Sequence, residues 1–523
     1  MILQLAGKCK RRLSRLVNPR RKYIEYYERL PIDEHAVLLE GSRGRTIDGN
    51  IYYCTLELLT NELFKEYRTI LVIKNKEQIK TSFDKYGEIA GRITFVIHGS
   101  KEYYRAVATC KYLVNDSTFA PFFIKRREQV YLNTWHGTPL KTMGCKNNSE
   151  IDVLGNAQHN FCMADYFLAP NTMTERVMTE DYMVDDISSA VQLHVGYPRN
   201  TAFFSDGNEL KRKLGLEGKT VYAYLPTWRC VTSTADQSAN KAIESHLSAI
   251  DALLSDDEVM LAKLHHLSRT EIDFNKFQHV ICFPEAKETY QVLNLADILI
   301  TDYSSVMFDY AVSGRPIVMF VYDKEEYEKN RGFNINPEEL PFEKAETAEE
   351  LVSLLRRARV TEGQKEFVNS FCPWDAPDAT TQLMKQLIFG ESNIEAVPTF
   401  SNGKKNILLY NGSLESGKAV NQIKHYLEDK DLLEANWYIA FYTMKSKESI
   451  EVLRDLINSC EGIRYLEFRG RRNDCRNRKS GLVHEYERLL GYMKFDTIIT
   501  LESSDGRLEE LLEEANISYE GAE

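Results

Sequence analysis

Two segments of this chain carry residue types suited to chemistry, and each follows an apolar run typical of a strand. Residues 133–141 read N-T-W-H-G-T-P-L-K and place His136 just beyond such a run. Residues 301–305 read T-D-Y-S-S and place two serines where a helix is expected to begin. Parallel strands of α/β proteins carry their ligand-binding groups at their carboxyl ends. An imidazole there can act as a general base, and serine hydroxyls with free backbone N–H groups can bind phosphate.

Each of these residues also has an ordinary structural alternative. A single histidine is more often a structural residue than a catalyst, and serines at a strand–helix junction are often N-caps. Asp302 fits either a ribose hydroxyl or a turn. The surroundings of His136 favour catalysis, because Gly137 allows close backbone approach and Thr138 with Pro139 suits the start of a helix.

Cationic and hydroxyl groups follow further apolar runs between residues 220 and 305. A surface ion pair or a loop position would explain each of them separately. Gathered at one sheet edge they would suit a diphosphate, because cations and N–H donors stabilise the charge on a leaving phosphate. The expected donor-binding residues are Thr227, Arg229, Lys263, Thr301, Asp302, Ser304 and Ser305, and His265 is a further basic group beside Lys263. Together, the strand end at His136 and the strand end at Ser304 and Ser305 predict group transfer from a phosphorylated donor.

The residues around His136 and a later turn are expected on the acceptor side of the cleft. The turn, G-Y-P-R-N at residues 196–200, lies just before the boundary expected between two domains. It can reach the cleft between these domains, or it can be a simple turn with no role in binding. The expected acceptor-side residues are Trp135, Gly137, Thr138, Lys141, Arg199 and Asn200.

The composition is that of a globular protein of several domains. With 523 residues the chain should form two to four domains, and 43% hydrophobic residues fit an ordinary fold. A net charge of −11 argues against nucleic acid as a partner. Ten cysteines without metal-like spacing fit a reducing cytosol, and no metal is predicted. The lack of a P-loop motif argues against an ATPase of that class. No signal peptide or membrane-length apolar run appears, which predicts a protein that is soluble or attached to a membrane surface.

The amino terminus departs from this acidic average. Residues 1–22 carry eight Lys and Arg residues and no acidic residue, with apolar residues between them at roughly helical spacing. A basic amphipathic helix can lie on an anionic bilayer surface. Residues 1–33 are therefore expected to be a membrane-surface segment, and the alternative is a solvated helix that covers its own domain.

Strand-like runs alternate with helix-like segments from about residue 34, which predicts an α/β fold with parallel sheets. Two series of strands predict two Rossmann-like domains with a cleft between them, an acceptor domain at 34–205 and a donor domain at 206–390. Residues 391–405 are expected to be a linker. Residues 406–523 are expected to form an additional α/β module, with a basic patch at 469–479.

Taken in order, five motifs resemble the CDP-glycerol:poly(glycerophosphate) glycerophosphotransferase family of wall teichoic acid synthesis. They are W-H-G-T-P-L-K, G-Y-P-R-N, P-T-x-R, K-x-H and T-D-Y-S-S, and the resemblance covers roughly residues 35–390. It implies a GT-B-like architecture, peripheral attachment to the cytoplasmic face of the membrane, and transfer of a polyol phosphate. It also implies CDP-glycerol or CDP-ribitol as the donor substrate and no obligatory cofactor. The module at 406–523 lies outside the resemblance and is vaguely similar to half of a glycosyltransferase.

Carried over residue by residue, the resemblance makes His136 the base and Ser304 with Ser305 the contacts to the donor phosphate. It places Arg229 and His265 on the donor side, where His265 can assist the leaving phosphate. The chain departs from the family pattern at three points: His266 stands where proline is usual, Thr201 stands where aspartate is usual, and D-A-P-D at 375–378 replaces D-G. These departures leave the donor polyol and the acceptor open.

The predicted reaction is a single displacement. His136 deprotonates a hydroxyl of a lipid-linked saccharide or of a growing anionic polymer, the oxygen attacks the polyol-bearing phosphorus of the donor, and CMP leaves. Two alternatives stay open: a GT-B sugar transferase, which would use a nucleotide sugar, and a non-catalytic membrane scaffold for wall or capsule enzymes. The sequence leaves open which polyol is moved, whether the enzyme primes or polymerises, and whether it forms a homo-oligomer.

Overall fold

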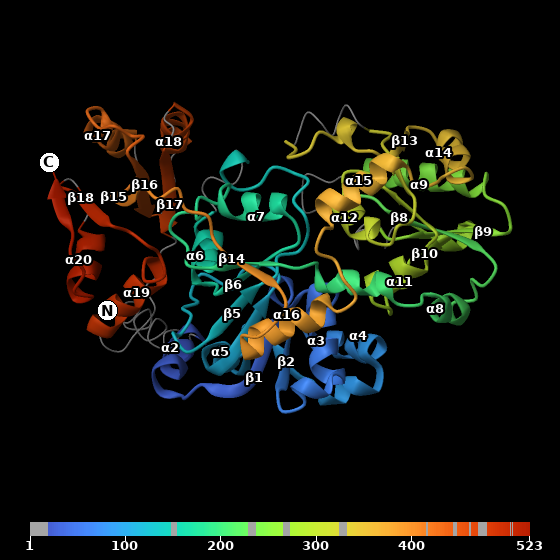
Figure 1. Cartoon of the computed structure of the whole chain (residues 1–523), viewed down its shortest axis with the longest axis horizontal. Coiled ribbons are helices and arrows are strands. Elements are labelled where there is room, and N and C mark those ends of the chain that lie inside the picture. Colours follow the sequence, from blue (N-terminus) through green and yellow to red (C-terminus); the bar gives the residue numbers. More distant parts are fainter. Residues whose placement is uncertain are drawn as a thin grey trace, which may run out of the picture.

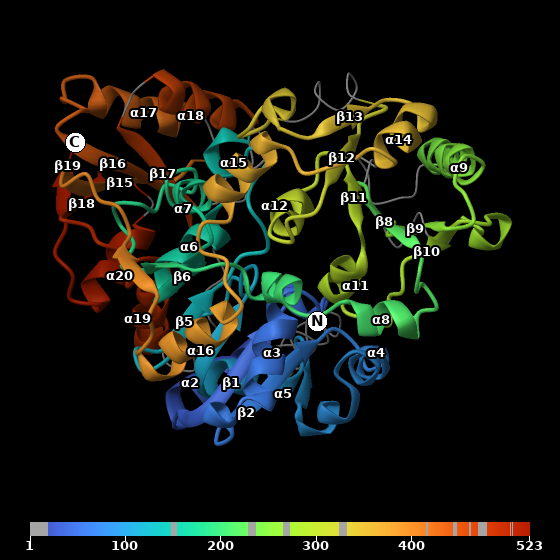
Figure 2. The same cartoon turned by 45° about the vertical axis from the view of Figure 1, so that its right-hand side comes forward.

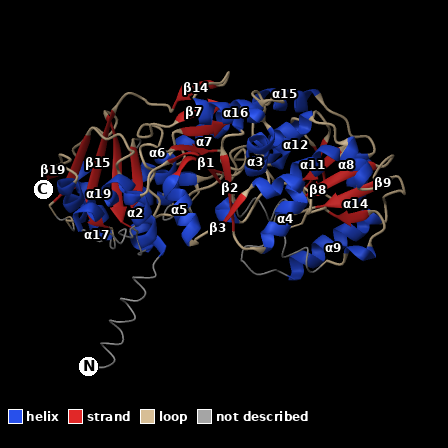
Figure 3. Ribbon diagram, turned by 90° about the horizontal axis from the view of Figure 1, so that it is seen from below, coloured by secondary structure: helices blue, strands red, loops and turns tan. Residues whose placement is uncertain are grey.

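The computed structural model describes residues 19–147, 154–227, 237–264, 272–323, 332–414, 417–442, 447–459, 462–468, 478–502, 504 and 506–522. These residues form three sheets that lie side by side, with the first sheet in the middle (Figure 1). Helices flank each sheet, as the view from below shows (Figure 3). The α/β fold class predicted from the sequence is confirmed.

The first sheet has eight strands in the order β14-β7-β6-β5-β4-β1-β2-β3, and every pair is parallel except β14 with β7. Its strands are β1 (Asp33–Glu40), β2 (Arg68–Ile73), β3 (Thr94–Ile97), β4 (Cys110–Asn115), β5 (Val130–Asn133), β6 (Tyr166–Ala169), β7 (Val191–His194) and β14 (Glu395–Pro398). Its helices are α2 (Pro19–Arg29), α3 (Asn50–Thr60), α4 (Glu77–Tyr86), α5 (Lys101–Thr109), α6 (Gly155–Met163), α7 (Thr172–Thr179) and α16 (Ala379–Phe389), with short 3₁₀ turns η1 (Ser42–Gly44) and η5 (Pro198–Phe204). We call this sheet and these helices the first lobe.

The second sheet is parallel throughout, with the order β10-β9-β8-β11-β12-β13. Numbered along the chain this is 3-2-1-4-5-6, the order of Rossmann-like sheets, whose ligand crevice opens where the order reverses. Here that point lies between β8 and β11. The elements are β8 (Thr220–Leu225), β9 (Glu258–Ala262), β10 (Val280–Cys282), β11 (Ile298–Thr301), β12 (Ile317–Phe320), β13 (Glu343–Ala345), α8 (Asn208–Lys213), α9 (Gln237–Asp251), α11 (Thr289–Leu295), α12 (Val306–Ala311), α14 (Ala348–Leu355) and α15 (Glu362–Phe371). We call them the second lobe.

The third sheet has the order β17-β16-β15-β18-β19, again 3-2-1-4-5 along the chain. Its elements are β15 (Lys405–Ser413), β16 (Ala435–Tyr442), β17 (Ile463–Phe468), β18 (Thr497–Leu501), β19 (Glu520–Ala522), α17 (Gly417–Leu427), α18 (Lys447–Ser459), α19 (Arg478–Leu489) and α20 (Arg507–Glu514). It lies beside α6 and α2 of the first lobe, as both views of the cartoon show (Figure 2).

The chain returns to the first lobe after the second sheet. Helix α16 packs on α3, and the Tyr112 hydroxyl donates to the carbonyl of Ile388 at 3.0 Å. The segment 391–405, expected to be a linker, contains β14, which extends the first sheet as an antiparallel edge strand. The end of β14 at Pro398 suits an edge, because proline cannot donate to a further strand. Residues 379–398 thus belong spatially to the first lobe, which corrects the expected linker.

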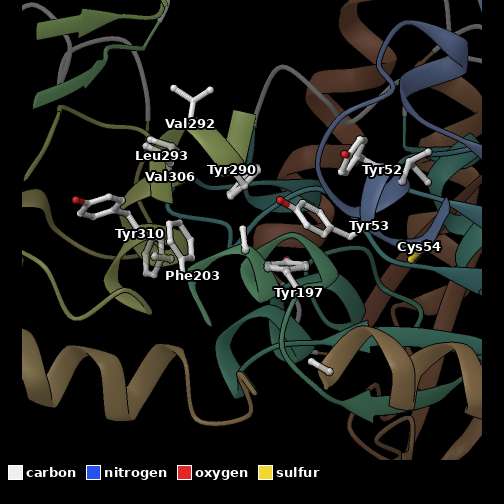
Figure 4. Close-up of a cluster of buried hydrophobic side chains, with 14 of the residues drawn as sticks. Tyr52, Tyr53, Cys54, Tyr197, Phe203, Tyr290, Val292, Leu293, Val306 and Tyr310 are labelled. Carbon is white, nitrogen blue, oxygen red and sulfur yellow. The ribbon is translucent and has the colours of Figure 1, made fainter. Parts of the chain in front are cut away.

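Aromatic side chains fill the contact between the two lobes. Tyr53 of α3 and Tyr197 at the start of η5 lie near Tyr290 of α11, with Phe203 and Tyr310 beyond (Figure 4). All five are buried. The apolar contact fixes how the strand ends of one sheet face those of the other.

None of the helices in the described part of the chain has the length and apolar character needed to cross a bilayer. Residues 1–18 of the expected membrane-surface segment and residues 469–477 of the basic patch lie outside the described residues. Helix α2 begins at Pro19, and its Tyr23 is fully buried, donating from its hydroxyl to the carbonyl of Ile124 at 2.7 Å.

Candidate active site

His136 lies on a tight turn that follows β5. Asn133 ends the strand, and its side-chain oxygen accepts from the backbone N–H of Trp135 at 2.9 Å. Trp135 has φ of +50°, which is rare for a bulky residue and marks a backbone held by its surroundings. The turn buries the indole and exposes the next side chain, so that His136 faces solvent at the end of the strand.

The hydrogen bonding of His136 suits a general base. Its Nδ1 lies 2.9 Å from the carbonyl oxygen of Asp116, an acceptor only, so Nδ1 carries the proton and Nε2 keeps a lone pair. The surrounding protein, through desolvation, and the positive charge of Arg199 lower the pKa of His136 below its ordinary value, against the hydrogen bond to Asp116. The imidazole is therefore neutral at pH 7 and able to accept a proton.

The two sequence segments that carry the expected chemistry meet across the cleft. A Cβ atom on Gly137 would lie 3.0 Å from the Ser305 hydroxyl oxygen, which is tighter than ordinary contact. A side chain at residue 137 would therefore crowd Ser305, and the φ of +153° at this residue favours glycine. The backbone beside His136 thus approaches the turn that leads from β11 into α12.

A second backbone contact joins the same loop to the second lobe. Lys141 pairs with Phe333 in an isolated antiparallel bridge, and the N–H of Thr142 donates to the carbonyl of Gly332 at 3.1 Å. A second hydrogen bond runs in the opposite direction, from the backbone N–H of Asn334 to the carbonyl of Leu140 at 2.8 Å. The loop that holds His136 is thereby fastened to the second lobe.

On the donor side, Thr227 and Asp302 lie at the ends of β8 and β11, where the strand order reverses. Both carboxylate oxygens of Asp302 accept from the Thr227 backbone N–H at 2.9 Å, and the Thr227 hydroxyl donates at 2.7 Å. Asp302 is buried, as is Thr301, whose hydroxyl donates to the carbonyl of Leu225. Thr301 and Asp302 therefore shape the turn, while Thr227, Ser304 and Ser305 stay half-exposed.

Lys263 borders a cavity of about 420 Å³ between the lobes, which is also lined by Asp48, Lys85, Phe283 and Thr289 among others. Its ammonium donates to the Thr289 hydroxyl, which in turn donates to Asp48 of the first lobe at 3.2 Å. Burial lowers the pKa of Lys263, and the charge of Asp48 opposes that shift. Lys263 is thus held at the cleft by groups from both lobes.

Arg199, expected on the acceptor side, is buried between the two lobes. It forms a two-pronged ion pair with Asp309 of α12, with Nη2 2.9 and 3.0 Å from the two carboxylate oxygens. Its Nη1 donates to the carbonyl of His136 at 2.9 Å. Arg199 therefore connects the His136 loop to the helix that follows Ser305.

Three other acceptor-side residues are also part of the framework. Asn200 is buried and donates to Asp375 at 2.9 Å, and the hydroxyl of Thr138 accepts from Asn171 at 3.1 Å. The Trp135 ring packs on His136, with centroids 4.1 Å apart. Of the expected acceptor-side residues, Gly137 and Lys141 contact the second lobe through Ser305 and Phe333, and the others hold the loop in place.

Arg229 and His265 lie outside the described residues, so their expected roles remain predictions. The structure adds Asp116, which orients His136, and Asp309, which pairs with Arg199. Their positions in the sequence could have indicated them, because Asp116 directly follows β4 and Asp309 lies one helical turn after Ser305. Among the described residues, no cluster of three or more His, Cys, Asp or Glu side chains is placed to hold a metal ion.

Residues 23–389 match the CDP-glycerol:poly(glycerophosphate) glycerophosphotransferase family. The chain belongs to this family. The resemblance predicted from the five motifs is confirmed, and the third sheet lies outside the matched residues.

Individual relatives agree with this assignment. The teichoic acid poly(glycerol phosphate) polymerase of Staphylococcus epidermidis is 29% identical over 53% of this chain and 39% of its own length. The enzyme of the same description from Bacillus spizizenii is 25% identical over 69% of this chain and 93% of its own length. The teichoic acid glycerol-phosphate transferase of Staphylococcus aureus is 28% identical over 56% of this chain and 80% of its own length. The chain thus spans less than half of the first of these relatives and most of the other two.

The fold is that of a solved relative. The structure of the wall teichoic acid polymerase TagF superimposes with a TM-score of 0.61 at 23% identity, covering 75% of this chain and 98% of that one. The predicted GT-B-like architecture, with two Rossmann-like halves, is therefore confirmed.

Proposed function

We propose that the chain transfers glycerol phosphate, or another polyol phosphate, from a CDP-activated donor to a hydroxyl of a lipid-linked saccharide or growing polymer. CMP leaves in the same step. Family membership supports the reaction class, and the activities for which the relatives are named support teichoic acid or a similar polymer as the product.

The observation that carries this proposal is the approach of two loops from different lobes. The backbone next to His136 comes so close to Ser305 that a Cβ atom at residue 137 would lie 3.0 Å from the Ser305 hydroxyl oxygen. A base and a half-exposed pair of hydroxyls therefore border one space, although some 170 residues separate them in the chain. Transfer between two bound substrates needs this arrangement, because holding reactants in line removes much of the entropic barrier.

In the proposed reaction His136 Nε2 takes the proton from the acceptor hydroxyl as its oxygen attacks the polyol-bearing phosphorus. The Nδ1–H bond to Asp116 fixes the tautomer and stabilises the imidazolium that forms. On the donor side, Ser304, Ser305, Thr227 and Lys263 contact the diphosphate and disperse the charge that develops on CMP. Arg229 and His265 join this set as predictions from the sequence.

The acceptor is proposed to be lipid-linked, and the enzyme to work at the cytoplasmic face of the membrane. The eight cationic residues among residues 1–22 support electrostatic attachment to anionic lipid, an attraction that salt weakens. Deleting residues 1–18 removes five of these charges and leaves Tyr23, which belongs to the core. We expect this deletion to reduce sedimentation with anionic vesicles at low salt and to spare turnover of a soluble acceptor. Undiminished, salt-insensitive binding would contradict the attachment.

The function is tested by the nucleotide that the enzyme releases. Purified chain is incubated with CDP-glycerol, CDP-ribitol or a nucleotide sugar, each with and without a lipid-linked acceptor. We expect CMP from at least one CDP-polyol, and only when acceptor is present. Release of a nucleoside diphosphate from a nucleotide sugar would instead support a sugar transferase, and the absence of any turnover would support a scaffold.

A further inference from the structure

The reaction above leaves one cationic turn of the first lobe without a role. It consists of Ser42–Gly44 (η1) and Arg45, which follow β1 directly. Both arginines of the turn, Arg43 and Arg45, are exposed. The turn carries two positive charges in a chain whose net charge is −11.

The turn lies at the point where the strand order of the first sheet reverses. Along the chain the first seven strands follow the order 3-2-1-4-5-6-7, so the reversal falls between β1 and β4. In open α/β sheets this point is where ligands bind. The equivalent point of the second sheet, between β8 and β11, carries the donor-side residues. The first sheet has Arg43 at the same topological place.

Hydrogen bonds hold this turn in one conformation. The side-chain amide of Gln78 donates to the carbonyls of Gly44 and Arg45, at 3.1 Å each. Gly44 packs so closely on the end of β2 that a Cβ atom would lie 2.7 Å from the carbonyl carbon of Ile73. The backbone that carries both arginines is therefore already ordered, which lowers the entropic cost of binding a ligand.

One residue connects this turn to the catalytic base. The Asp116 carboxylate accepts the backbone N–H of Ser42 at 2.7 Å, and the Asp116 carbonyl accepts Nδ1–H of His136 at 2.9 Å. Arg43 thus directly follows Ser42, whose backbone N–H is bonded to the residue that orients His136. A ligand bound to the turn would lie beside the acceptor hydroxyl rather than at a remote surface.

Within the described part of the chain, the positive charges of Arg43 and Arg45 are not neutralised by an ion pair. Glu40 interacts electrostatically with Arg43, but it is fully buried, and burial raises its pKa to about 8, so it is largely neutral at pH 7. Asp116, with a pKa raised by burial to about 6, is the acidic group that accepts from the turn itself.

We propose that Arg43 and Arg45 bind a phosphodiester group of the anionic acceptor and so hold its terminal hydroxyl at His136. This inference rests on the proposed function and names the acceptor as a chain that already carries polyol phosphate. The planar guanidinium donates paired hydrogen bonds that match the oxygens of a phosphate. An acceptor without phosphate would gain nothing from this turn.

The test compares acceptors that differ in charge. Wild type and Arg43→Gln/Arg45→Gln are assayed with soluble acceptor analogues carrying no, one or several glycerol phosphate units. Loss of two charge-assisted contacts should raise KM for the phosphate-bearing analogues by about 10-fold to 100-fold. KM for CDP-glycerol and turnover of the uncharged analogue should stay within about 2-fold. Equal effects on charged and uncharged analogues, or no effect, would overturn the proposal.

Two control variants show whether the effect belongs to this turn and to its charge. Arg359→Gln neutralises an exposed arginine after α14 in the second lobe and should change none of these constants. Arg43→Lys/Arg45→Lys keeps the charge but loses the paired hydrogen bonds of the guanidinium, so it should retain part of the preference for phosphate, even if the glutamine variant folds poorly. Retention of the wild-type preference by the folded glutamine variant contradicts the site.

Direct binding separates this proposal from the function on which it rests. Calorimetry with a soluble glycerol phosphate oligomer should show binding to wild type and about 10-fold weaker binding to the glutamine variant, whether or not CMP is released. If the wild type releases no CMP but this difference holds, the reaction is wrong and the site stands. If the two proteins differ instead in binding vesicles of anionic phospholipid, the turn binds lipid headgroups and the proposal falls.

Discussion

The second and third sheets share the order of their first five strands, yet they meet the first lobe in different ways. The strand ends of the second sheet face the loop of His136 and leave a cavity beside Lys263. The third sheet presents β17 to α6, where Glu467 accepts the N–H of Gly155 at 3.2 Å and Gln158 donates to the carbonyl of Tyr465 at 2.8 Å. One sheet therefore borders the site, while the other packs behind it.

The core of the third sheet continues into the catalytic loop. Trp135 packs against Phe161 and Tyr182, and these residues share one hydrophobic cluster with Tyr438 and Leu466 of the third sheet. Topology alone thus does not make a site, because side chains at the strand ends decide what a sheet can do. We infer that the third sheet supports the loop that carries His136.

The largest expected effect comes from removing the base at the strand end. His136→Asn should lower kcat by about 10²-fold to 10⁴-fold, because a positioned general base contributes about that much. Donor binding and thermal unfolding should change little, since the imidazole is exposed. The matched control is His35→Asn, an exposed histidine at the start of β1. A kcat above about a tenth of wild type would remove His136 from the mechanism.

The next effect concerns the buried link between the lobes. Arg199→Met leaves Asp309 buried without its partner, and breaking such a pair costs about 3–5 kcal/mol. The free energy of unfolding in urea should fall by about that amount, and kcat should fall because the carbonyl of His136 loses its donor. The double variant Arg199→Met/Asp309→Leu should recover part of the stability. Unchanged stability in the single variant would show that the pair contributes nothing.

The support from the third sheet predicts a smaller loss. Arg464 of β17 pairs with Asp185 and Asp186 of the first lobe at 2.8 Å each. Arg464→Ala should cost up to about 3 kcal/mol, because the pair is partly exposed, and should lower kcat with KM for the donor unchanged. Arg356→Ala breaks a more exposed pair with Glu258 in the second lobe and should leave kcat unchanged. Equal kcat values in the two variants would contradict the claim that the third sheet supports the loop of His136.

The smallest effect expected is a shift in the pH profile. Desolvation by the surrounding protein and the charge of Arg199 lower the pKa of His136, so the imidazole keeps its lone pair to a lower pH than an ordinary histidine. The acid limb of kcat/KM should therefore fall below pH 6.5, with the rate lost as pH falls through that lowered pKa. Arg199→Met removes one cause and should move the limb upward. An acid limb above pH 7 would contradict this role of the base.

The strand ends that carry the site were predictable, and the groups that hold them were less so. Residues 130–133 and 298–301 are apolar and end in polar turns, so the pattern indicates both strands. Strand β4 is harder to recognise, because it follows α5 without a turn signal between them, and Asp116 at its end was not among the expected site residues. The ion pair of Arg199 was not predictable, because Asp309, 110 residues away, comes to it only in the folded chain.

The most direct test of the central claim is a crystal structure of the His136→Asn variant with CDP-glycerol. The proposed mechanism predicts the diphosphate at the ends of β8 and β11, within hydrogen-bonding distance of Ser305 and Lys263, with the polyol-bearing phosphorus facing residue 136. Donor bound instead at the ends of β15 and β18 would show that the third sheet holds the site, and would contradict the mechanism.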